Sequence, residues 1–283
     1  MTTKFTITTN KEVTKINVKS HDSAFVSALR RTLISSIPTY SVDIDSIDIK
    51  ENNTIYHNER IAHILTSIYV NNNTKFKYDD VTFSLDSKDK KIVYSHDIKS
   101  SDNNLYFHPN VPIIELKKGD KLVINSFKLK KDVQRTHSQF QACIVQYRPE
   151  TFPLNVDLKI SPCSICDGIS YPYDTKTVAK MAFSVLKEKI NNLKQNIIND
   201  NAIIESVKCN DSNLTTIILN NENDTLGYLI QSHIMNMKDF NNFIGYKNIH
   251  PLKHKLLIKL IHDKPKELLV KTLTELEKLL PHV

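Results

Sequence analysis

The stretch SAFVSALRRTLISSIPTYSVDIDSIDI, residues 23–49, decides the fold, because its hydrophobic spacing changes from that of a helix to that of a strand. Before Pro38, apolar side chains recur every three or four residues, which predicts an amphipathic helix with Asp22 as its N-cap. Pro38 cannot continue that helix. From Tyr40 to Ile49, apolar and polar residues alternate with one slip, which predicts a strand. The helical positions are Phe25, Ala28, Leu29, Leu33 and Ile37.

Regular periodicity continues on both sides of this stretch. Residues 3–19 alternate around Thr-Asn-Lys and predict a β-hairpin. Residues 58–70 place apolar side chains on one face and predict a second, shorter helix, whereas residues 154–160 predict a strand. Asp174 begins a long helix with an apolar seam suited to a partner helix. The seam consists of Phe183, Leu186, Ile190, Leu193 and Ile197.

Residues 75–148 differ in character from their neighbours. Short β-like runs (VTFSL, KIVYS, LVINSF and ACIVQY) alternate with turn-like breaks (DSKDKK, KSSDNN and KKGDK). This pattern predicts a β-rich domain that is inserted into the first half of the chain.

Residues 200–283 repeat the order of elements in the first half. A strand at 214–219 precedes a helix opened by Asp224, and a strand at 255–261 precedes a helix that starts near Pro265. The apolar positions of these helices are Leu226, Leu229, Ile230 and Ile234, and Leu269, Leu273, Leu276 and Leu280.

Two halves that each end in a helix with an apolar seam predict an α+β fold in which the halves pair as a pseudo-dimer within one chain. The expected domains are a discontinuous one formed by 1–74 and 149–199, the inserted β-rich domain 75–148, and a last domain 200–283. The pattern by itself leaves open a second interpretation, two unrelated α+β domains.

Composition excludes several classes of protein. The chain has 283 residues, of which 40% are hydrophobic, enough for one large or two modest domains. A membrane span needs about 18 apolar residues in a row, and no run in the sequence is that long. The N-terminus lacks the apolar stretch of a secretory signal. The net charge of +7 fits a neighbour of nucleic acid and equally a subunit on acidic partners. The four cysteines show no disulfide pattern, which favours a reducing compartment.

Specific strings in the first half carry a family resemblance. Residues 23–49, followed by NERIAH at 58–63, are similar to the signature of the bacterial alpha subunit and the third subunit of eukaryotic RNA polymerase II. That signature is an N-A-L-R-R-like helix, I-P, a strand and an N-E-x-I-A-H helix. Residues 111–147 are similar to the same family's I-P-I-x-x-L-x-x-G-Q strand pair, with Gly119 at its hairpin, and to its later H-x-x-x-x-x-x-x-V-x-Y stretch.

The second half resembles a different subunit. Residues 221–260 are similar to the eleventh subunit of RNA polymerase II and to the archaeal L subunit. The strings DTLG, FIGY and HPLKHK correspond to the family's D-H-T-L-G-N, F-x-G-Y and H-P-L-x-H-K. The resemblance makes Gly227, Gly245, His250, Pro251 and His254 the expected turn and signature positions.

The resemblance implies a non-catalytic assembly subunit of a multisubunit DNA-directed RNA polymerase, with two partner subunits fused as in large cytoplasmic DNA viruses. It implies contacts with the two largest polymerase subunits and small assembly subunits, and contact with DNA only through the complex. It implies no homodimer, membrane or cofactor. We expect a location in the viral factories of the host cytoplasm and in the virion, or in the nucleus of a cellular organism. The implied large-subunit interface is Arg30, Arg31, Asn58 and Glu59, and the implied intramolecular dimerisation residues are Phe25, Leu29, Leu33, Phe183, Leu186, Ile190, Leu226, Leu229, Ile230, Leu273 and Leu276.

The sequence departs from the family pattern in three places. Ile64 stands where the family's second helix carries an arginine, and residues 67–70 replace I-P-L. The inserted domain lacks the zinc-binding cysteine cluster of the eukaryotic third subunit. Subunit contacts that the family makes through those elements are therefore not carried over to this chain.

No motif predicts catalysis. The sequence contains no phosphate-binding or dinucleotide-binding glycine loop, no zinc-protease motif, no nucleophile elbow and no D-x-D-x-D cluster. Asp43, Asp45 and Asp48 alternate with apolar residues, as on the solvated face of a strand. Cys163 and Cys166 form half of a zinc site, so we interpret them as a reduced pair in a loop and keep zinc as the alternative.

Three other functions stay open at this point. A stand-alone basic nucleic-acid-binding protein would account for the charge and the lysine-rich turns, and salt-sensitive DNA binding by the isolated chain would favour it. An unrecognised enzyme would show activity of the purified chain on a nucleotide substrate. A homodimeric alpha-like subunit is disfavoured, because the second half already fills the partner surface.

Overall fold

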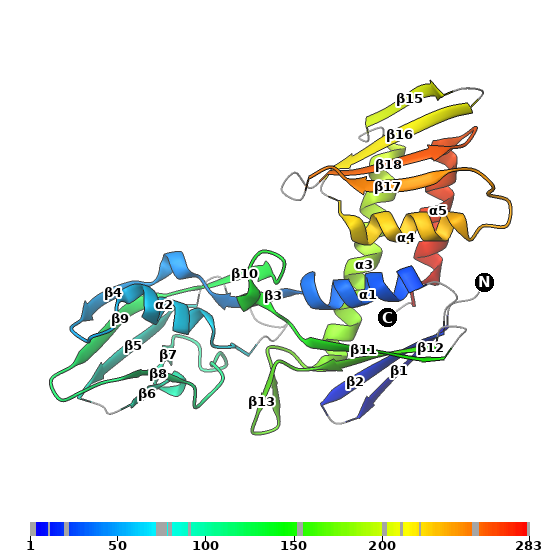
Figure 1. Ribbon diagram of the computed structural model, residues 1–283. Coiled ribbons are helices and arrows are strands. Elements are labelled where there is room, and N and C mark those ends of the chain that lie inside the picture. Colours follow the sequence, from blue (N-terminus) through cyan, green and yellow to red (C-terminus); the bar gives the residue numbers. More distant parts are fainter. Residues whose placement is uncertain are drawn as a thin grey trace.

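The computed structural model shows a body of helices and sheets from which a second body extends (Figure 1). It describes residues 4–10, 12–19, 23–71, 78, 81–89, 92–151, 155–199, 203–209, 212–220, 222–250 and 255–281. The predicted mixture of helices and sheets is confirmed, since the described residues form five α-helices and several antiparallel sheets. Within the described part of the chain, no helix is long and apolar enough to cross a membrane.

Four strands form the N-terminal sheet: β1 (Lys4–Asn10), β2 (Val13–Lys19), β11 (Ile144–Thr151) and β12 (Asn155–Ser161). Their order is β1-β2-β12-β11. The predicted hairpin at 3–19 is confirmed, with Phe5 opposite Val18 and Ile7 opposite Ile16. The predicted strand at 154–160 is confirmed as β12.

Two helices from the first half pack against this sheet, α1 (Ser23–Ser35) and α3 (Thr175–Ile198). Asp174 caps α3 as predicted, because its carboxylate accepts a hydrogen bond from the backbone N–H of Thr177 at 2.9 Å. The predicted cap of α1, Asp22, lies outside the described residues. The predicted seam of α3 is buried along its whole length.

The second half builds a second sheet of four strands: β15 (Ile203–Cys209), β16 (Ser212–Asn220), β17 (Ile244–Asn248) and β18 (Lys255–Ile261). Their order is β15-β16-β18-β17. Its helices are α4 (Asp224–Met235) and α5 (Pro265–Leu279), which begin where the sequence predicts. Asn223, rather than Asp224, caps α4 by accepting a hydrogen bond from the backbone N–H of Thr225. The sequence analysis did not predict β15 or β17.

The second body, called here the inserted module, consists of strands β3 to β10 with α2. Its elements are β3 (Pro38–Val42), β4 (Asp48–Asn52), α2 (Asn58–Thr66), β5 (Phe83–Lys88), β6 (Ile92–Tyr94), β7 (Lys99–Ser100), β8 (Pro112–Glu115), β9 (Lys121–Phe127) and β10 (Leu129–Val133). They form a four-stranded sheet β4-β9-β5-β7 and the two-stranded pairs β6-β8 and β10-β3. A short hairpin of β13 (Ser164–Cys166) and β14 (Ile169–Tyr171) follows the N-terminal sheet.

Three predictions about this region are corrected by the structure. The single strand predicted from Tyr40 to Ile49 is wrong, because a 3-10 turn at Ile44–Ser46 separates β3 from β4, which pair with different strands. The second helix ends at Thr66 instead of residue 70. The segment ACIVQY leads into β11, which pairs with β12 in the N-terminal sheet and not with the inserted module.

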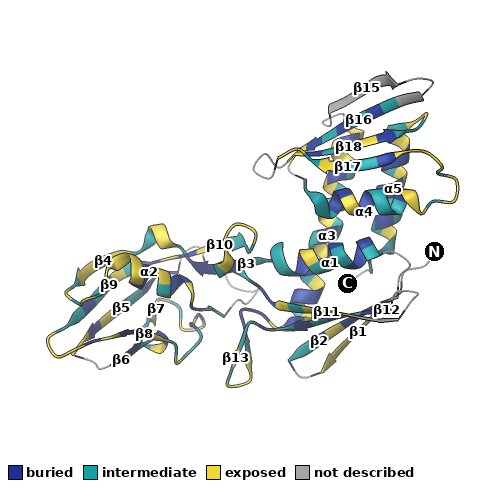
Figure 2. Ribbon diagram, in the orientation of Figure 1, coloured by how far each residue is buried: buried dark blue, intermediate teal, exposed yellow. Residues whose placement is uncertain are grey.

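Two separate hydrophobic cores explain this arrangement (Figure 2). The core of the inserted module takes its buried side chains from Val42 to Leu129 and includes α2, so its packing begins well before the predicted boundary at residue 75. The larger core joins residues of both halves, from Ile16 of β2 to Leu280 after α5. Ala142 and Cys143 belong to this larger core, although the sequence analysis assigned them to the inserted domain.

Candidate assembly interface

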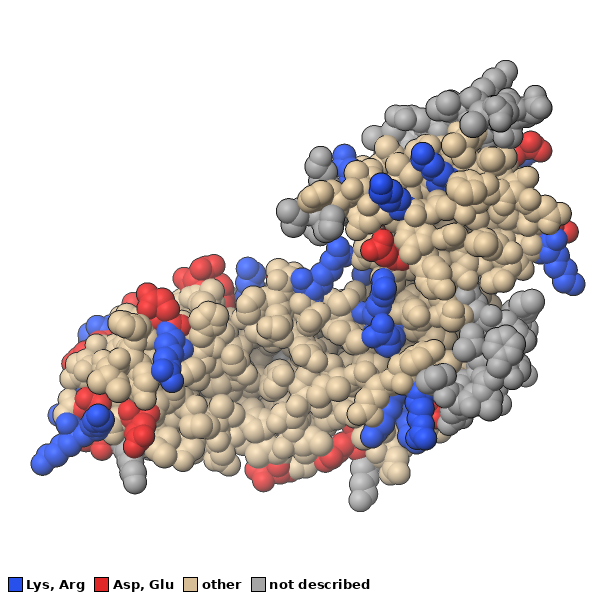
Figure 3. Space-filling view, viewed as in Figure 1, with Lys and Arg blue, Asp and Glu red and all other residues tan. Residues whose placement is uncertain are grey.

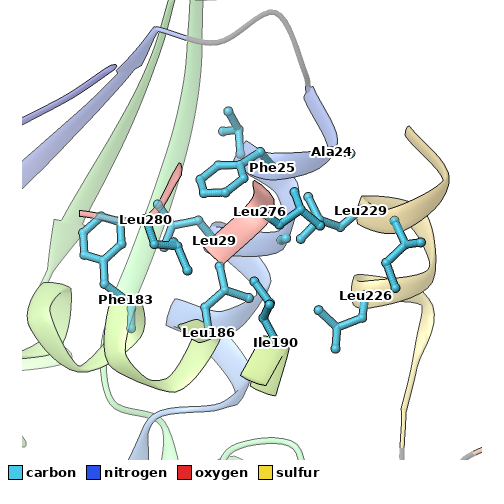
Figure 4. Close-up of a cluster of buried hydrophobic side chains, with 14 of the residues drawn as sticks. Ala24, Phe25, Leu29, Phe183, Leu186, Ile190, Leu226, Leu229, Leu276 and Leu280 are labelled. Carbon is cyan, nitrogen blue, oxygen red and sulfur yellow. The ribbon is translucent and has the colours of Figure 1, made fainter. Parts of the chain in front are cut away.

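Four helices meet in the larger core, two from each half of the chain. Figure 4 shows Phe25 and Leu29 of α1 near Phe183 and Leu186 of α3, with side chains of α4 and α5 closing the cluster. The structure thus brings together the residues that the sequence analysis assigned to intramolecular dimerisation, all of them buried: Phe25, Leu29, Leu33, Phe183, Leu186, Ile190, Leu226, Leu229, Ile230, Leu273 and Leu276.

This apolar contact supplies the main stabilising term between the halves. Burial of one leucine or phenylalanine side chain contributes about 1.5–3 kcal/mol, and each of the four helices contributes several such side chains. The half-buried ring of Phe5 adds aromatic contacts on the β1 side, 5.6 Å from Phe25 and 5.5 Å from Phe183 between ring centroids. A separation of the halves would expose this whole surface to water.

Gly227 allows α4 to lie directly on the second sheet. A Cβ atom at this position would lie 2.7 Å from Cδ2 of Tyr246 and 2.9 Å from Cδ1 of Leu256. The ring of Tyr246 on β17 therefore packs against the helix backbone, in space that any other residue would fill. The signature position Gly245 has a different environment, since the atoms nearest to a Cβ there belong to the exposed ring of Phe243, the first at 3.1 Å.

Polar contacts also cross between the helices of the two halves. Lys194 on α3 donates a hydrogen bond to Glu277 on α5 at 3.1 Å, and Asn191 donates to the other carboxylate oxygen at 3.2 Å. The bond from Lys194 lowers the pKa of Glu277. Both side chains of the ion pair are about one-fifth exposed, so water screens the pair only in part.

A second polar cluster joins three segments around Glu222, just before α4. Burial raises the pKa of Glu222 to about 7, although Lys189 of α3 and Arg135 after β10 act in the opposite direction. Burial lowers the pKa of Lys189, whose amine donates a hydrogen bond to Ser36 Oγ at 3.0 Å. The cluster therefore links the end of α1, the middle of α3 and the entrance of the second half.

Arg30 and Arg31 lie on the part of α1 that faces away from the core. Arg31 is exposed and Arg30 is half-buried, and among the described residues neither guanidinium forms an ion pair. Arg31 lies close enough to Tyr246 to act on the pKa of its phenol, which burial raises. An exposed arginine beside a tyrosine from the other half is a composition typical of protein interfaces.

Asn58 and Glu59 stand apart from those arginines, because α2 belongs to the inserted module (Figure 1). Both side chains are exposed, and Asn58 accepts a hydrogen bond from Asn52 Nδ2 at 2.8 Å. The next residue, Arg60, lies over the ring of Tyr56 at 4.6 Å from its centroid. Arg60 borders a groove of about 230 Å³ between α2 and β8, lined by Tyr56, Arg60, Ile61, Ile64, Ile92, Pro112, Ile113, Ile114 and Glu115.

The two cysteines of the C-x-x-C pair have different hydrogen-bond partners. The thiol of Cys163 donates to the carbonyl oxygen of Gln141 at 3.6 Å, and burial raises its pKa to about 11. The thiol of Cys166 donates to the carboxylate of Asp167 at 3.6 Å. Among the residues that the structure describes, no three His, Cys, Asp or Glu side chains gather as metal ligands would.

The histidine signature is described only in part. His250 is exposed two residues after the end of β17, and Pro251 and His254 lie outside the described residues. The sequence analysis missed Tyr246 as a packing partner of Gly227, and it missed the cluster around Glu222. The string FIGY contains Tyr246, but its contact with Gly227 joins β17 to α4, and the spacing of residues in the sequence does not show which elements pack together.

Comparison with known proteins finds a family match in the second half. Residues 215–283 match the RNA polymerase Rpb3/Rpb11 dimerisation domain. The matched stretch begins within β16 and contains α4, β17, β18 and α5, so it includes both helices that the second half contributes to the contact described above.

Curated relatives of the chain are subunits of DNA-directed RNA polymerase. Subunit Rpo3 of Thermococcus kodakarensis is 34% identical over 143 residues, which is 47% of this chain and 54% of that subunit. Subunit Rpo3 of Methanocaldococcus jannaschii is 30% identical over 125 residues, 44% of this chain and 63% of that subunit. The chain therefore spans between half and two-thirds of the length of these relatives.

Proposed function

We propose that this chain is a non-catalytic subunit of a DNA-directed RNA polymerase, in which two partner halves pair within one chain and form an assembly platform. The observation that carries the proposal is the single core in which α1 and α3 meet α4 and α5, because the latter pair lies in a stretch that matches a dimerisation domain. The Rpo3 relatives, which are polymerase subunits, support the same conclusion.

Under this proposal the first half corresponds to the third subunit and residues 200–283 to the eleventh, an intramolecular pseudo-heterodimer. Each half contributes a four-stranded sheet and two helices, which supports this division. A covalent link makes the pairing intramolecular, with an effective concentration that reaches the millimolar range for short linkers. The viral source and the location in viral factories remain predictions of the sequence.

The two largest polymerase subunits are the proposed partners of the platform. Arg30 and Arg31 support a docking surface on α1, because neither forms an ion pair with a described residue. Arg31 also lies near Tyr246 of the second half, where the two halves meet. Asn58 and Glu59 support a second surface on α2, next to the groove between α2 and β8. We propose that the separate bodies carrying these helices contact different parts of the polymerase.

Affinity purification of the tagged chain from its native source, with mass spectrometry of the recovered proteins, tests the proposal. We expect both large polymerase subunits in stoichiometric amounts with the wild-type chain, and less of one of them with Arg30→Ala/Arg31→Ala. Arg148→Ala is the matched control, since Arg148 is an exposed arginine of β11 outside the proposed surface. Recovery of the wild-type chain without polymerase subunits would contradict the proposal and favour a stand-alone nucleic-acid-binding protein.

A further inference from the structure

The outer face of the C-terminal sheet has a composition unlike that of a solvated surface. Strands alternate their side chains between two faces, and Ile217, Leu256 and Ile258 point into the larger core. Leu214, Ile218, Leu257 and Ile261 therefore point to the outer face, where they are only half-buried. No described helix or strand covers this face, and the sheet lies in front of α3 and α5 in Figure 1.

An aromatic ring extends this apolar surface onto β17. Phe243 is 54% exposed, and Cζ of its ring lies 3.1 Å from the position that a Cβ of Gly245 would take. Because Ile244 points into the core, Gly245 faces outward, opposite Lys259 of β18. The glycine thus leaves room for the ring of Phe243 on the outer face.

Three exposed lysines lie among the apolar positions: Lys247 on β17 and Lys255 and Lys259 on β18. Lys259 stands between Leu257 and Ile261 along the outer face of β18. Lys247 is paired opposite Leu257, which places the two lysines of β18 diagonally beside it, at about 7–8 Å. None of the three forms an ion pair with a described residue, and no described residue of β16, β17 or β18 is acidic. Figure 3 shows lysines and arginines, with few acidic residues between them, on this face.

The N-terminal sheet provides an internal comparison, because polar and charged side chains occupy most of its outer face. Asn17 and Asp157 are paired there and joined by a hydrogen bond of 2.8 Å, and Lys15 is paired with Lys159. The corresponding positions of β11 are Gln146 and Arg148. Two aliphatic side chains, Val13 and Ile144, also lie on this outer face, on strands that β12 separates. The outer face of the second sheet carries four, Leu214, Ile218, Leu257 and Ile261, on the adjacent strands β16 and β18.

We propose that the outer face of β16, β18 and β17 is a docking surface for another protein, whose contact surface carries aliphatic side chains interspersed with carboxylates. The inference rests on the proposed function, and it assigns to this face an acidic patch of a further polymerase subunit. Aliphatic side chains at the surface are buried when a protein partner covers them, and lysines without acidic neighbours on these three strands favour a partner of the opposite charge.

Two other occupants fit this surface less well. Nucleic acid would engage the lysines but would leave the aliphatic side chains against a phosphate backbone, and Phe243 is the one exposed aromatic ring for base stacking on the described part of the face. A second copy of the chain would bring two sets of lysines together, which like-charge repulsion disfavours.

Site-specific photo-crosslinking in the native polymerase complex tests the inference. A photo-reactive phenylalanine analogue replaces Leu257 in the tagged full-length chain, and a matched variant carries it at Asn17 on the outer face of the N-terminal sheet. We expect position 257 to crosslink to one polymerase subunit, at a segment rich in Asp and Glu, and position 17 to give at least tenfold less product. Equal yields at the two positions, or a crosslink to nucleic acid or to a second copy, would overturn the proposal.

Charge reversal provides the second measurement. We expect Lys247→Glu/Lys255→Glu/Lys259→Glu to reduce recovery of the crosslinked subunit roughly tenfold or more, while Lys15→Glu/Arg148→Glu/Lys159→Glu leaves it unchanged. Circular dichroism of each purified variant verifies that the sheets are folded. Retention of every subunit by the folded first variant would overturn the docking surface alone, whereas absence of polymerase subunits from the wild-type purification would overturn the proposed function as well.

Discussion

Gly227 has no space for even a methyl group, because Tyr246 and Leu256 lie within 3 Å of the position of its Cβ. We expect Gly227→Ala to lower the free energy of unfolding by about 1–3 kcal/mol through overpacking, despite the higher helix propensity of alanine. Denaturant titration measures this change. Gly245→Ala is the control, with an expected change of about 0.5 kcal/mol or less, since the exposed ring of Phe243 can move aside. Equal losses in both variants would refute the close packing of α4.

Glu222 makes stability depend on pH near neutrality. Its pKa in the folded protein is about 7, above the ordinary value of 4.5, so the native state binds more protons than the unfolded state between these values. Stability is therefore expected to fall as pH rises from about 4.5 to 7, by on the order of 1–3 kcal/mol for this half-buried group.

Glu222→Gln should remove that dependence and stabilise the protein at pH 8, because the amide remains uncharged. Thermal unfolding of both proteins from pH 4 to pH 8 measures the effect. Glu267→Gln serves as the control, since Glu267 forms an exposed ion pair with Lys264 on the first turn of α5. Parallel stability profiles of wild type and Glu222→Gln would show that Glu222 is not the titrating group.

At the level of elements, a destabilising substitution in α3 is expected to lower the stability of both halves. Ile190 is buried where α3 meets the other helices, whereas Ile198, at the end of the same helix, is 51% exposed. We expect Ile190→Ala to cost about 2–5 kcal/mol and Ile198→Ala less than about 0.5 kcal/mol. Hydrogen exchange should show lost protection in β2 and β16 together for Ile190→Ala. A loss confined to the first half would argue against one shared core.

The sequence predicted the elements whose signal is local. The spacing of Phe183, Leu186 and Ile190 specifies a helix and its buried face, and Asp174 and Pro265 mark helix starts, because these signals operate within one or two turns. Strand partners are a non-local property, so the division of residues 40–49 between two sheets was not visible. The strand β17 carries Gly245 and Lys247 among few apolar residues, which gave no alternation to detect.

The candidate site was predictable only where its signal is local. The apolar residues between the halves followed from helical periodicity together with family resemblance, and the structure places them in one core. The polar cluster between the halves could not be predicted, because Glu222, Lys189 and Arg135 come from three segments that only the folded chain brings together. The outer face of the C-terminal sheet was equally hidden, because the run KLLIKLI indicates a strand without showing which side is covered.

At the level of the whole molecule, the chain should tolerate a break between its halves. Residues 1–199 and 200–283 expressed separately would expose the apolar faces of four helices and should aggregate. Co-expressed, we expect them to form a one-to-one complex that is less stable than the intact chain, because the effective concentration supplied by the link is lost. Size-exclusion chromatography with light scattering measures the stoichiometry. Two soluble, folded monomers would contradict the pairing.

The ion pair between Lys194 and Glu277 has a consequence for how this protein evolves. In an assembly of two separate subunits, complementary residues are encoded by two genes, and each new allele must fit every version of its counterpart. Here both ends of the pair come from one reading frame and are inherited together. A swap of the two charges, or a coordinated change in the apolar contact around them, passes to descendants as a unit. The contact residues between the two halves can therefore change together, without staying complementary to those of related subunits.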